Sequence, residues 1–232
     1  MKNIRINKFV AENSDYSRRE VDRLIAKGEV FVDGEKAKLG EKIDVSKSIS
    51  VKGEKINIKK NKVLIAYHKP VGVICTTDEK SKDNIISKIN YTERIYPIGR
   101  LDVTTSGLIL LTNSSVLKRK FEDPNSMMEK EYVVVLNKDI SDRFVDKMER
   151  GVNIGGYTTK PAVAKRLSSR KLSLIITEGK NRQIRKMVQK LGYEVIKLIR
   201  VRVGDFLLAD LPRGEWKTIN KYKADCLDMS RE

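Results

Sequence analysis

Two short apolar faces with helical spacing open the chain. They comprise Ile4, Ile6, Phe9 and Val10, and then Val21, Leu24 and Ile25. The second face follows Ser17 and Glu20, which have the spacing of a capping box, in which each side chain binds the other residue's backbone N–H. Gly28 then supplies a stop signal. The pattern predicts two helices, and Ser17 is the expected N-cap of the second.

Small strands are predicted directly after these helices. Residues 30–32 alternate and precede the Asp33-Gly34 pair, which is a strong hairpin signal. Residues 49–51 and 56–58 also alternate, on either side of the Lys52-Gly53 turn. The first sixty residues therefore combine two helices with two hairpins.

The rest of the chain alternates between strand and helix patterns. Strands are expected at 63–66, 71–75, 131–136 and 194–203, with others before 178, and helices at 84–90, 114–121, 141–151 and 181–191. Residues 107–112 form a continuous apolar run, which is typical of a strand covered on both faces. Residues 59–62 are a charged break, so we expect two domains, 1–60 and 61–232.

The net charge of the chain indicates what kind of partner it binds. The chain has 232 residues, with 48 Lys and Arg against 31 Asp and Glu, which gives +17. Such an excess favours a polyanionic partner, because each phosphate that is neutralised releases a counterion. A membrane surface is the competing explanation, but no apolar run reaches the roughly 18 residues needed to span a bilayer. The N-terminus also lacks the apolar core of a secretory signal.

Cysteine and histidine are scarce. Cys75 and Cys226 cannot build a disulfide framework or a zinc site, and both are expected to be reduced in the cytoplasm. His68 is the single histidine, for which a structural role is expected. No Gly-rich phosphate-binding loop is present. We therefore expect chemistry that needs neither a metal nor an organic cofactor.

One carboxylate has a setting that suggests catalysis. Asp102 follows Arg100 in a Gly-Arg-Leu-Asp turn, directly before the buried run at 107–112. Taken alone, an Arg and an Asp near a turn form a surface ion pair of little energetic value. A polar loop held by a rigid buried strand, however, is where catalytic groups concentrate.

Residues 99–108, continuing through 111–113, resemble the signature of RNA pseudouridine synthases, in particular the subgroup that modifies bacterial ribosomal RNA. Residues 67–72, 178–187 and 211–216 resemble further segments of the same subgroup. The resemblance implies an α+β fold, in which a mixed, mostly antiparallel sheet has flanking helices. It also implies that Asp102 is the essential catalytic residue.

Four further site residues are implied by the same resemblance. Arg100 would hold the flipped-out state of the target, and Tyr132 would stack on the uracil. Ile184 would contact the base from its other side, and Arg185 would pair with Asp102 and keep it ionised. From the residues alone, Tyr132 is equally an ordinary strand tyrosine, and 181–191 is equally a basic amphipathic helix.

Two groups of residues are expected to bind RNA. Residues 17–20 and 28–34 resemble the S4-type (alpha-L) RNA-binding module, whose second helix here carries Arg18, Arg19, Arg23 and Lys27. The alternative is that these residues only solvate a helix face. Lys180, Asn181 and Arg182 stand where a strand, a glycine and a helix start would present N–H groups to an anion.

Several roles stay open at this level. Lys69 is either structural or RNA-facing, Arg200 and Arg202 either contact RNA or pair within the fold, and Trp216 is expected in the core. The predicted activity is conversion of one uridine to pseudouridine in large-subunit (23S) rRNA by a monomer. The alternatives are a small-subunit (16S) enzyme, a non-catalytic RNA-binding or ribosome-assembly protein, and a general nucleic-acid-binding protein.

Overall fold

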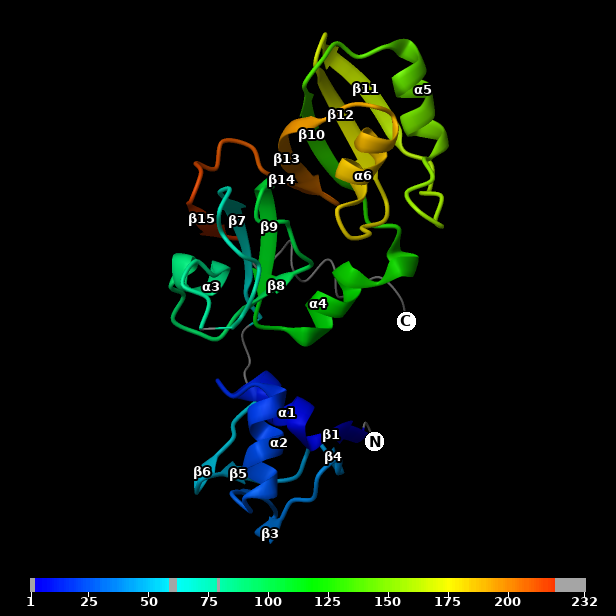
Figure 1. Ribbon diagram of the computed structural model, residues 1–232. Helices are drawn as coiled ribbons and strands as arrows, with labels where there is room; N and C mark the ends of the chain where they lie inside the picture. Colours follow the sequence, from blue (N-terminus) through cyan, green and yellow to red (C-terminus); the bar gives the residue numbers. More distant parts are fainter. Residues whose placement is uncertain (1–2, 59–61, 79, 220–232) are drawn as a thin grey trace. The chain divides into compact units, whose positions relative to one another are not determined.

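A computed structural model describes residues 3–58, 62–78 and 80–219 (Figure 1). These residues divide into two compact units. The first, the N-terminal unit, takes in the described part of Met1–Lys62 with Thr92–Arg94 and Asn113–Ser115, and the second, the larger unit, takes in the rest. Cys226, the predicted tail after residue 221 and most of the charged break at 59–62 lie outside the described residues.

The N-terminal unit is built from the predicted helices and hairpins. Helices α1 (Ile6–Asn13) and α2 (Arg18–Ala26) precede β2 (Val30–Val32), β3 (Glu35–Lys36), β5 (Ile49–Val51) and β6 (Glu54–Lys55), which pair in the order β3-β2-β5-β6. The strands β1 (Asn3–Arg5) and β4 (Lys42–Asp44) form a separate pair. The expected capping box is confirmed, since Ser17 and Glu20 exchange side-chain and backbone hydrogen bonds at the start of α2. Ile4 lies in β1 and not in the first helix.

The larger unit is one mixed sheet with helices against it. Its strands run in the order β11-β12-β10-β13-β9-β7-β15, and β8 and β14 pair with β9 and β13. The strands are β7 (Leu64–Lys69), β8 (Tyr96–Ile98), β9 (Ser106–Thr112), β10 (Lys130–Leu136), β11 (Val163–Ser168), β12 (Lys171–Ile176), β13 (Val195–Val203), β14 (Phe206–Leu207) and β15 (Trp216–Thr218). The helices are α3 (Ile85–Ile89), α4 (Ser115–Glu122), η1 (Pro124–Ser126), α5 (Asp142–Arg150) and α6 (Gln183–Lys190). The pairing of β13 with β9 is parallel and the other pairings are antiparallel, as the α+β prediction requires.

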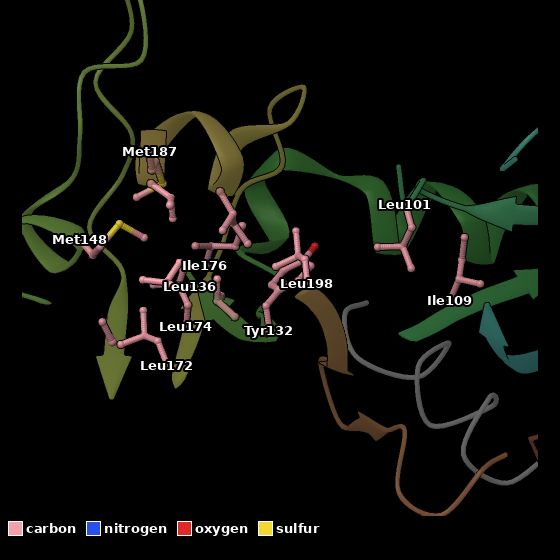
Figure 2. Packing of buried hydrophobic residues seen from close by; sticks show 14 of the residues in the cluster. Leu101, Ile109, Tyr132, Leu136, Met148, Leu172, Leu174, Ile176, Met187 and Leu198 are labelled. Atoms are coloured by element: carbon pink, nitrogen blue, oxygen red, sulfur yellow. The ribbon is translucent and has the colours of Figure 1, made fainter. Parts of the chain in front are cut away.

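Strand β9 runs between two hydrophobic clusters. Ile109 and Leu111 join the cluster that includes Tyr132, Leu174 and Met187, and α5 and α6 pack on that side (Figure 2). Leu108 and Leu110 point the opposite way, into a second cluster with Phe121 of α4. All seven residues of β9 are buried, which confirms that this strand is covered on both faces. The strand is therefore a rigid support for the loop that precedes it.

Gly107 allows β9 and β13 to pair closely. Its φ is +115°, and a Cβ at this position would lie 2.2 Å from the carbonyl oxygen of Arg200. The parallel register joins Arg200 to Gly107 directly. A side chain at position 107 would push these two strands apart, so the glycine is required here.

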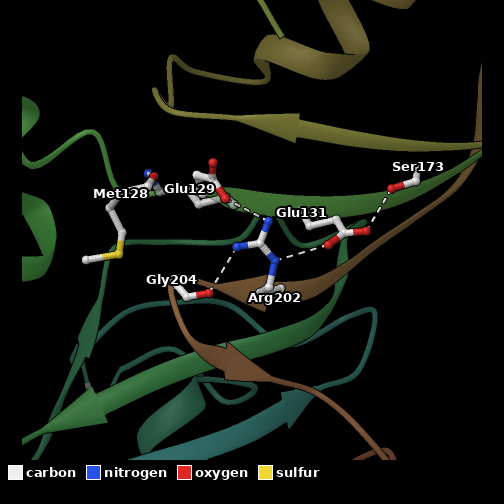
Figure 3. A network of polar contacts seen from close by, with 7 residues as sticks. Met128, Glu129, Glu131, Ser173, Arg202 and Gly204 are labelled. Carbon is white, nitrogen blue, oxygen red and sulfur yellow. Dashed lines mark hydrogen bonds and ion pairs between the residues drawn. The ribbon is translucent and has the colours of Figure 1, made fainter. Parts of the chain in front are cut away.

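The basic residues of β13 pair within the fold. Arg200 is 4% exposed and its Nε donates to the carbonyl oxygen of Leu108 at 2.7 Å. Arg202 binds Glu129, Glu131 and the carbonyl oxygen of Gly204, and Glu131 also accepts a hydrogen bond from Ser173 (Figure 3). This network ties β10 to β12 and β13. Both arginines therefore pair within the fold, and Arg200 also lines a hollow of the larger unit.

Lys69, His68 and Trp216 are also structural. Lys69 is fully buried, and its Nζ donates to the carbonyl oxygens of Pro70 and Val73 at 2.8 and 2.9 Å. The ring Nδ1 of His68 lies 2.8 Å from the carbonyl oxygen of Leu211. Trp216 is partly buried against the main cluster, edge-on to Tyr91 at 5.6 Å between ring centroids.

Three predicted elements need correction. The second strand of the second hairpin is Glu54–Lys55 and not residues 56–58, because it starts directly after the Lys52-Gly53 turn. Residues 71–75 are not a strand, and only Ile74 forms an isolated bridge, with Asn84. The reason is that Gly72 turns with φ +96° and its N–H bonds to the carbonyl of Val103, so this segment packs as a loop. Helix α6 begins at Gln183 and not at residue 181, because Arg182 takes the left-handed conformation.

Candidate active site

A cleft of about 680 Å³ in the larger unit brings together the five residues predicted to act on the substrate. Arg100 and Asp102 come from the loop between β8 and β9, Tyr132 from β10, and Ile184 and Arg185 from the first turn of α6. Lys180, Asn181 and Arg182, predicted to bind RNA, line the same cleft. These residues are separated by up to 85 positions in the chain, and the fold brings them together at one place.

The loop that carries Asp102 is held at several points. The backbone carbonyl of Asp102 accepts the N–H of Thr105 at 3.0 Å. The carbonyl of Val103 accepts the N–H of Gly72 at 2.9 Å. Leu101 N–H donates to Cys75 Sγ at 3.4 Å. The guanidinium of Arg185 donates to the carbonyl of Thr104 at 2.9 Å. A carboxylate on a loop with this many anchors keeps its position when a substrate enters.

The ion partner of Asp102 differs from the expected one. Arg182 Nη1 lies 3.9 Å from Asp102 Oδ2, and the two side chains are 49% and 33% exposed. Arg185, which was expected to pair with Asp102, instead binds the carbonyl oxygens of Thr104 and Val195. The predicted direct pair is therefore replaced here by a loose pair with Arg182. Carbonyl and carboxylate oxygens both accept hydrogen bonds from a guanidinium, so the sequence pattern alone does not select between them.

Arg185 still acts on Asp102 through its charge. Burial and the neighbouring Arg182 lower the pKa of the Arg185 guanidinium, and the Asp102 carboxylate opposes that shift. The Nε of Arg185 is buried and has no hydrogen-bond partner among the described residues. A half-buried guanidinium with spare donor capacity can still take up another acceptor.

Two apolar side chains form the part of the cleft that suits a flat base. Tyr132 is 8% exposed and Ile184 is 4% exposed, and both line the cleft. Their contacts belong to the main hydrophobic cluster, so their positions are fixed by core packing. A planar ring can lie against such surfaces at little entropic cost.

The segment before α6 is cationic and tightly turned. Arg182 has φ +52° and ψ +34°, and no side chain caps the helix. Gln183, which is buried, accepts the N–H of Lys180 at 3.0 Å and donates to Glu178 at 2.7 Å. This turn directs Lys180, Asn181 and Arg182 to the surface of the cleft, where all three are exposed.

Sequence reasoning missed two residues of the cleft. Thr105 is 2% exposed, lines the cleft, and its hydroxyl has no hydrogen-bond partner among the residues that the structure describes. Cys75 also lines the cleft, and burial raises the pKa of its thiol, so it stays neutral. For Thr105, its position shortly after Asp102 was the only signal in the sequence. For Cys75, nothing in the local pattern indicated a place in the cleft.

The four basic residues of the N-terminal unit that were predicted to bind RNA are on its surface. Arg18, Arg19, Arg23 and Lys27 are all exposed on α2 or at its end. Arg18 also donates to Asn7 Oδ1 at 3.3 Å, and its partners leave most of the guanidinium free for solvent or ligand. Exposure is compatible with both predicted alternatives, RNA binding and simple solvation.

No helix in 3–58, 62–78 or 80–219 is long and apolar enough to cross a membrane. Within the same residues, no group of three or more His, Cys, Asp and Glu could hold a metal ion.

Comparison with known proteins defines the class. Residues 63–190 match the family described as RNA pseudouridylate synthase, and residues 4–49 match the S4 domain. A solved structure titled "Crystal structure of pseudouridylate synthase" superimposes with a TM-score of 0.71 and 28% identity, covering 97% of this chain and 99% of that one. The chain therefore belongs to the RNA pseudouridine synthase family and carries an S4 domain.

Named relatives lie within the same class. The dual-specificity RNA pseudouridine synthase RluF of Escherichia coli O6:H1 is 39% identical over 218 residues, which cover 93% of this chain and 75% of the relative. The ribosomal large subunit pseudouridine synthase B of Bacillus subtilis strain 168 is 35% identical over 228 residues, which cover 94% and 93%. The predicted family and domain types are thereby confirmed.

Proposed function

We propose that this protein converts one uridine to pseudouridine in large-subunit (23S) ribosomal RNA. The observation that carries the proposal is the cleft that joins Asp102, Tyr132, Ile184 and Arg185 in a chain of this family. The choice of large-subunit RNA is supported by the relative named for that subunit. The net charge of +17 fits a polyanionic partner.

The reaction sets clear demands on the site. The bond from the ribose C1′ to uracil N1 breaks, the base turns, a bond forms from C1′ to C5, and the C5 proton is transferred to N1. Because the target atoms are inaccessible in a stacked helix, the nucleotide must leave the stack. In our proposal Arg100 holds the opened RNA, and Tyr132 and Ile184 hold the uracil between them.

Asp102 is the proposed reacting group. Its carboxylate, in the ionised form, either attacks the ribose or removes a proton from it. Arg182 lies 3.9 Å from this carboxylate, and Arg185 holds its loop through the Thr104 carbonyl. We propose residues 61–232 as the catalytic domain and 1–60 as the domain that adds RNA affinity through α2. The proposal places the protein in the cytoplasm, with its rRNA.

The experiment is an Asp102→Asn variant assayed on rRNA. The amide keeps the size of the side chain and removes its charge. We expect RNA affinity within about 3-fold of the native protein and no pseudouridine, since a group that acts only in the transition state contributes to rate and not to binding. Asp205→Asn, on an exposed turn, is the matched control and should be fully active. Turnover by Asp102→Asn would overturn the assignment, and no isomerisation by the native protein would leave a non-catalytic RNA binder.

A further inference from the structure

A second hollow, the side pocket, lies beside the cleft. It has a volume of about 390 Å³ and shares Arg100, Tyr132 and Lys180 with the cleft. Its own wall includes Lys130 and Lys160. Since the two hollows have a common wall, one strand of nucleic acid could enter both. Nothing in the reaction at Asp102 requires this second space.

Three ammonium groups of the side pocket lack an acidic partner. Lys130 Nζ donates to the carbonyl oxygen of Met128 at 2.9 Å, and Lys160 Nζ lies 3.4 Å from the sulfur of Met127, a weak acceptor. Lys180 Nζ lies 4.7 Å from the ring centroid of Tyr157. Among the described residues, none of these three forms an ion pair with a carboxylate. Three cations with spare donors at one hollow favour an anionic ligand.

The three acidic residues of the side pocket, Glu122, Asp123 and Glu178, already have partners within the fold. Asp123 Oδ1 accepts the N–H of Asn125 at 2.9 Å. Glu178 accepts hydrogen bonds from the Tyr157 hydroxyl, the N–H of Lys160 at 3.0 Å and Gln183. Glu122 accepts the N–H of Gly99 at 2.7 Å and also binds Lys118. These carboxylates therefore stabilise the wall and do not neutralise the three lysines.

Burial strengthens the case for an anion at Lys130. Burial, and then the charge of Arg200, lower the pKa of the Lys130 ammonium. A phosphate beside this amine would offset both effects, because it supplies the opposite charge in a partly desolvated place. Arg100 and Arg200 add two further cations to the wall, and its aromatic part includes Tyr132, Tyr157 and Phe121.

We propose that the side pocket binds a second nucleotide of the RNA strand, next to the target uridine, with its phosphate at Lys130 and Lys160 and its base against the aromatic wall. Unpaired RNA is recognised by such a combination of cations and stacking rings. The inference rests on the proposed function, because that function places the target uridine in the cleft. It adds that the flanking nucleotide also leaves the helical stack.

The test compares ligands of increasing length. Uridine 5′-monophosphate and the trinucleotide UpUpU compete with a fluorescein-labelled decauridine for the native full-length protein. We expect UpUpU to bind at least about 10-fold more tightly than the monophosphate, the size of a stacking contact plus a phosphate contact. In Lys130→Met and in Lys160→Ala, this gain in affinity of UpUpU over the monophosphate should shrink to about 3-fold or less. The slope of log affinity against log salt for UpUpU should fall by about one in each variant. Tyr157→Leu should lose part of the gain and Tyr157→Phe should keep it.

Two controls make each result decisive. Lys165→Ala removes an exposed charge of β11 outside both hollows and should keep the whole gain. An unchanged gain in Lys130→Met and Lys160→Ala would overturn the proposal. Equal competition by inorganic phosphate and by UpUpU at this site would replace the nucleotide with a free anion, and would also overturn it. The gain should persist in Asp102→Asn, so failure of isomerisation and failure of the side pocket are separate outcomes.

Discussion

Arg185 Nη2 donates a hydrogen bond to the carbonyl oxygen of Thr104 at 2.9 Å, across 81 positions of sequence. Thr104 stands two residues after Asp102, so this bond fixes the loop that carries the carboxylate. The same guanidinium reaches the carbonyl of Val195 at 3.3 Å, at the start of β13. Arg185 thus links the two walls of the cleft and acts as a positioning residue for Asp102.

A lysine at this position should lose that function. A single ammonium cannot span both carbonyls in the planar geometry of a guanidinium. We expect Arg185→Lys to lower kcat for isomerisation by about 100-fold, the effect of displacing a reacting group by about 1 Å, with a much smaller change in KM. Steady-state assays on an rRNA substrate measure both constants. Arg213→Lys, an exposed arginine, is the control. Native kcat in Arg185→Lys would disprove the positioning role.

Arg182 should behave differently. It is half exposed and only loosely paired with Asp102, so a phosphate can draw it away. We expect Arg182→Gln to weaken RNA binding and to reduce the slope of log affinity against log salt by about one, the signature of one lost phosphate contact. Titrations at several salt concentrations give the slope, and turnover at saturating RNA should stay close to native. If turnover collapses while affinity is kept, Arg182 is instead the residue that holds Asp102 for reaction.

Gly107 should tolerate no side chain. An alanine would carry both a φ of +115° and a Cβ at 2.2 Å from the Arg200 carbonyl. We expect Gly107→Ala to reduce the free energy of unfolding by about 3 kcal/mol or more, from backbone strain and from overpacking together. Urea unfolding measures this. Gly179→Ala, with no positive φ and no atom within 4 Å of the added Cβ, should cost far less. Similar losses in both variants would contradict the close-approach argument.

Glu131 should make the larger unit sensitive to acid. The hydrogen bond from Ser173, and then that from Arg202, lower the pKa of Glu131. A lowered folded-state pKa means that the ionised form stabilises the fold above the unfolded pKa of about 4.3, and that this stabilisation is lost as the pH falls through the folded pKa. We expect Glu131→Gln to lower the free energy of unfolding at pH 7 by about 1 kcal/mol and to have little effect at about pH 2.

The control for this experiment is Glu194→Gln, an exposed glutamate, which should change stability little at either pH. Urea unfolding at the two pH values gives the comparison. A loss in Glu131→Gln that is equal at both pH values would show that packing, and not the charge, is responsible.

Local rules predicted the elements whose ends are chemically marked. Ser17 with Glu20 defined α2, and Ser141 and Gly151 bounded α5, because caps and stop residues act within a few positions of the chain. The apolar run of β9 predicted a strand covered on both faces. Residues 71–75 were misread as a strand because their backbone partners, Val103, Asp83 and the Asn84–Ile85 segment, are set by tertiary contacts.

Which side chains pair with one another in and around the cleft could not be predicted from the sequence pattern. The family resemblance selected the cleft residues Arg100, Asp102, Tyr132, Ile184 and Arg185, and the structure places all five in one cleft. It did not show that Arg182 faces Asp102, because that depends on the left-handed turn at residue 182. Likewise, the roles of Arg200 and Arg202 could not be assigned from the sequence, because their acceptors lie on the two strands that flank β13.

The parallel contact between β9 and β13 has a consequence for synthesis. The Asp102 loop enters β9, the α6 segment leads into β13, and the two strands meet at Ser106 with Ile199 and at Gly107 with Arg200. A nascent chain that has not yet emerged past residue 200 lacks the complete strand that joins β10 to β9, so the Asp102 loop and α6 are not yet held side by side. Catalytic competence therefore requires that β13 has been synthesised and has left the exit tunnel. Until then the unfinished enzyme is a basic, RNA-attracting chain without an assembled catalytic centre.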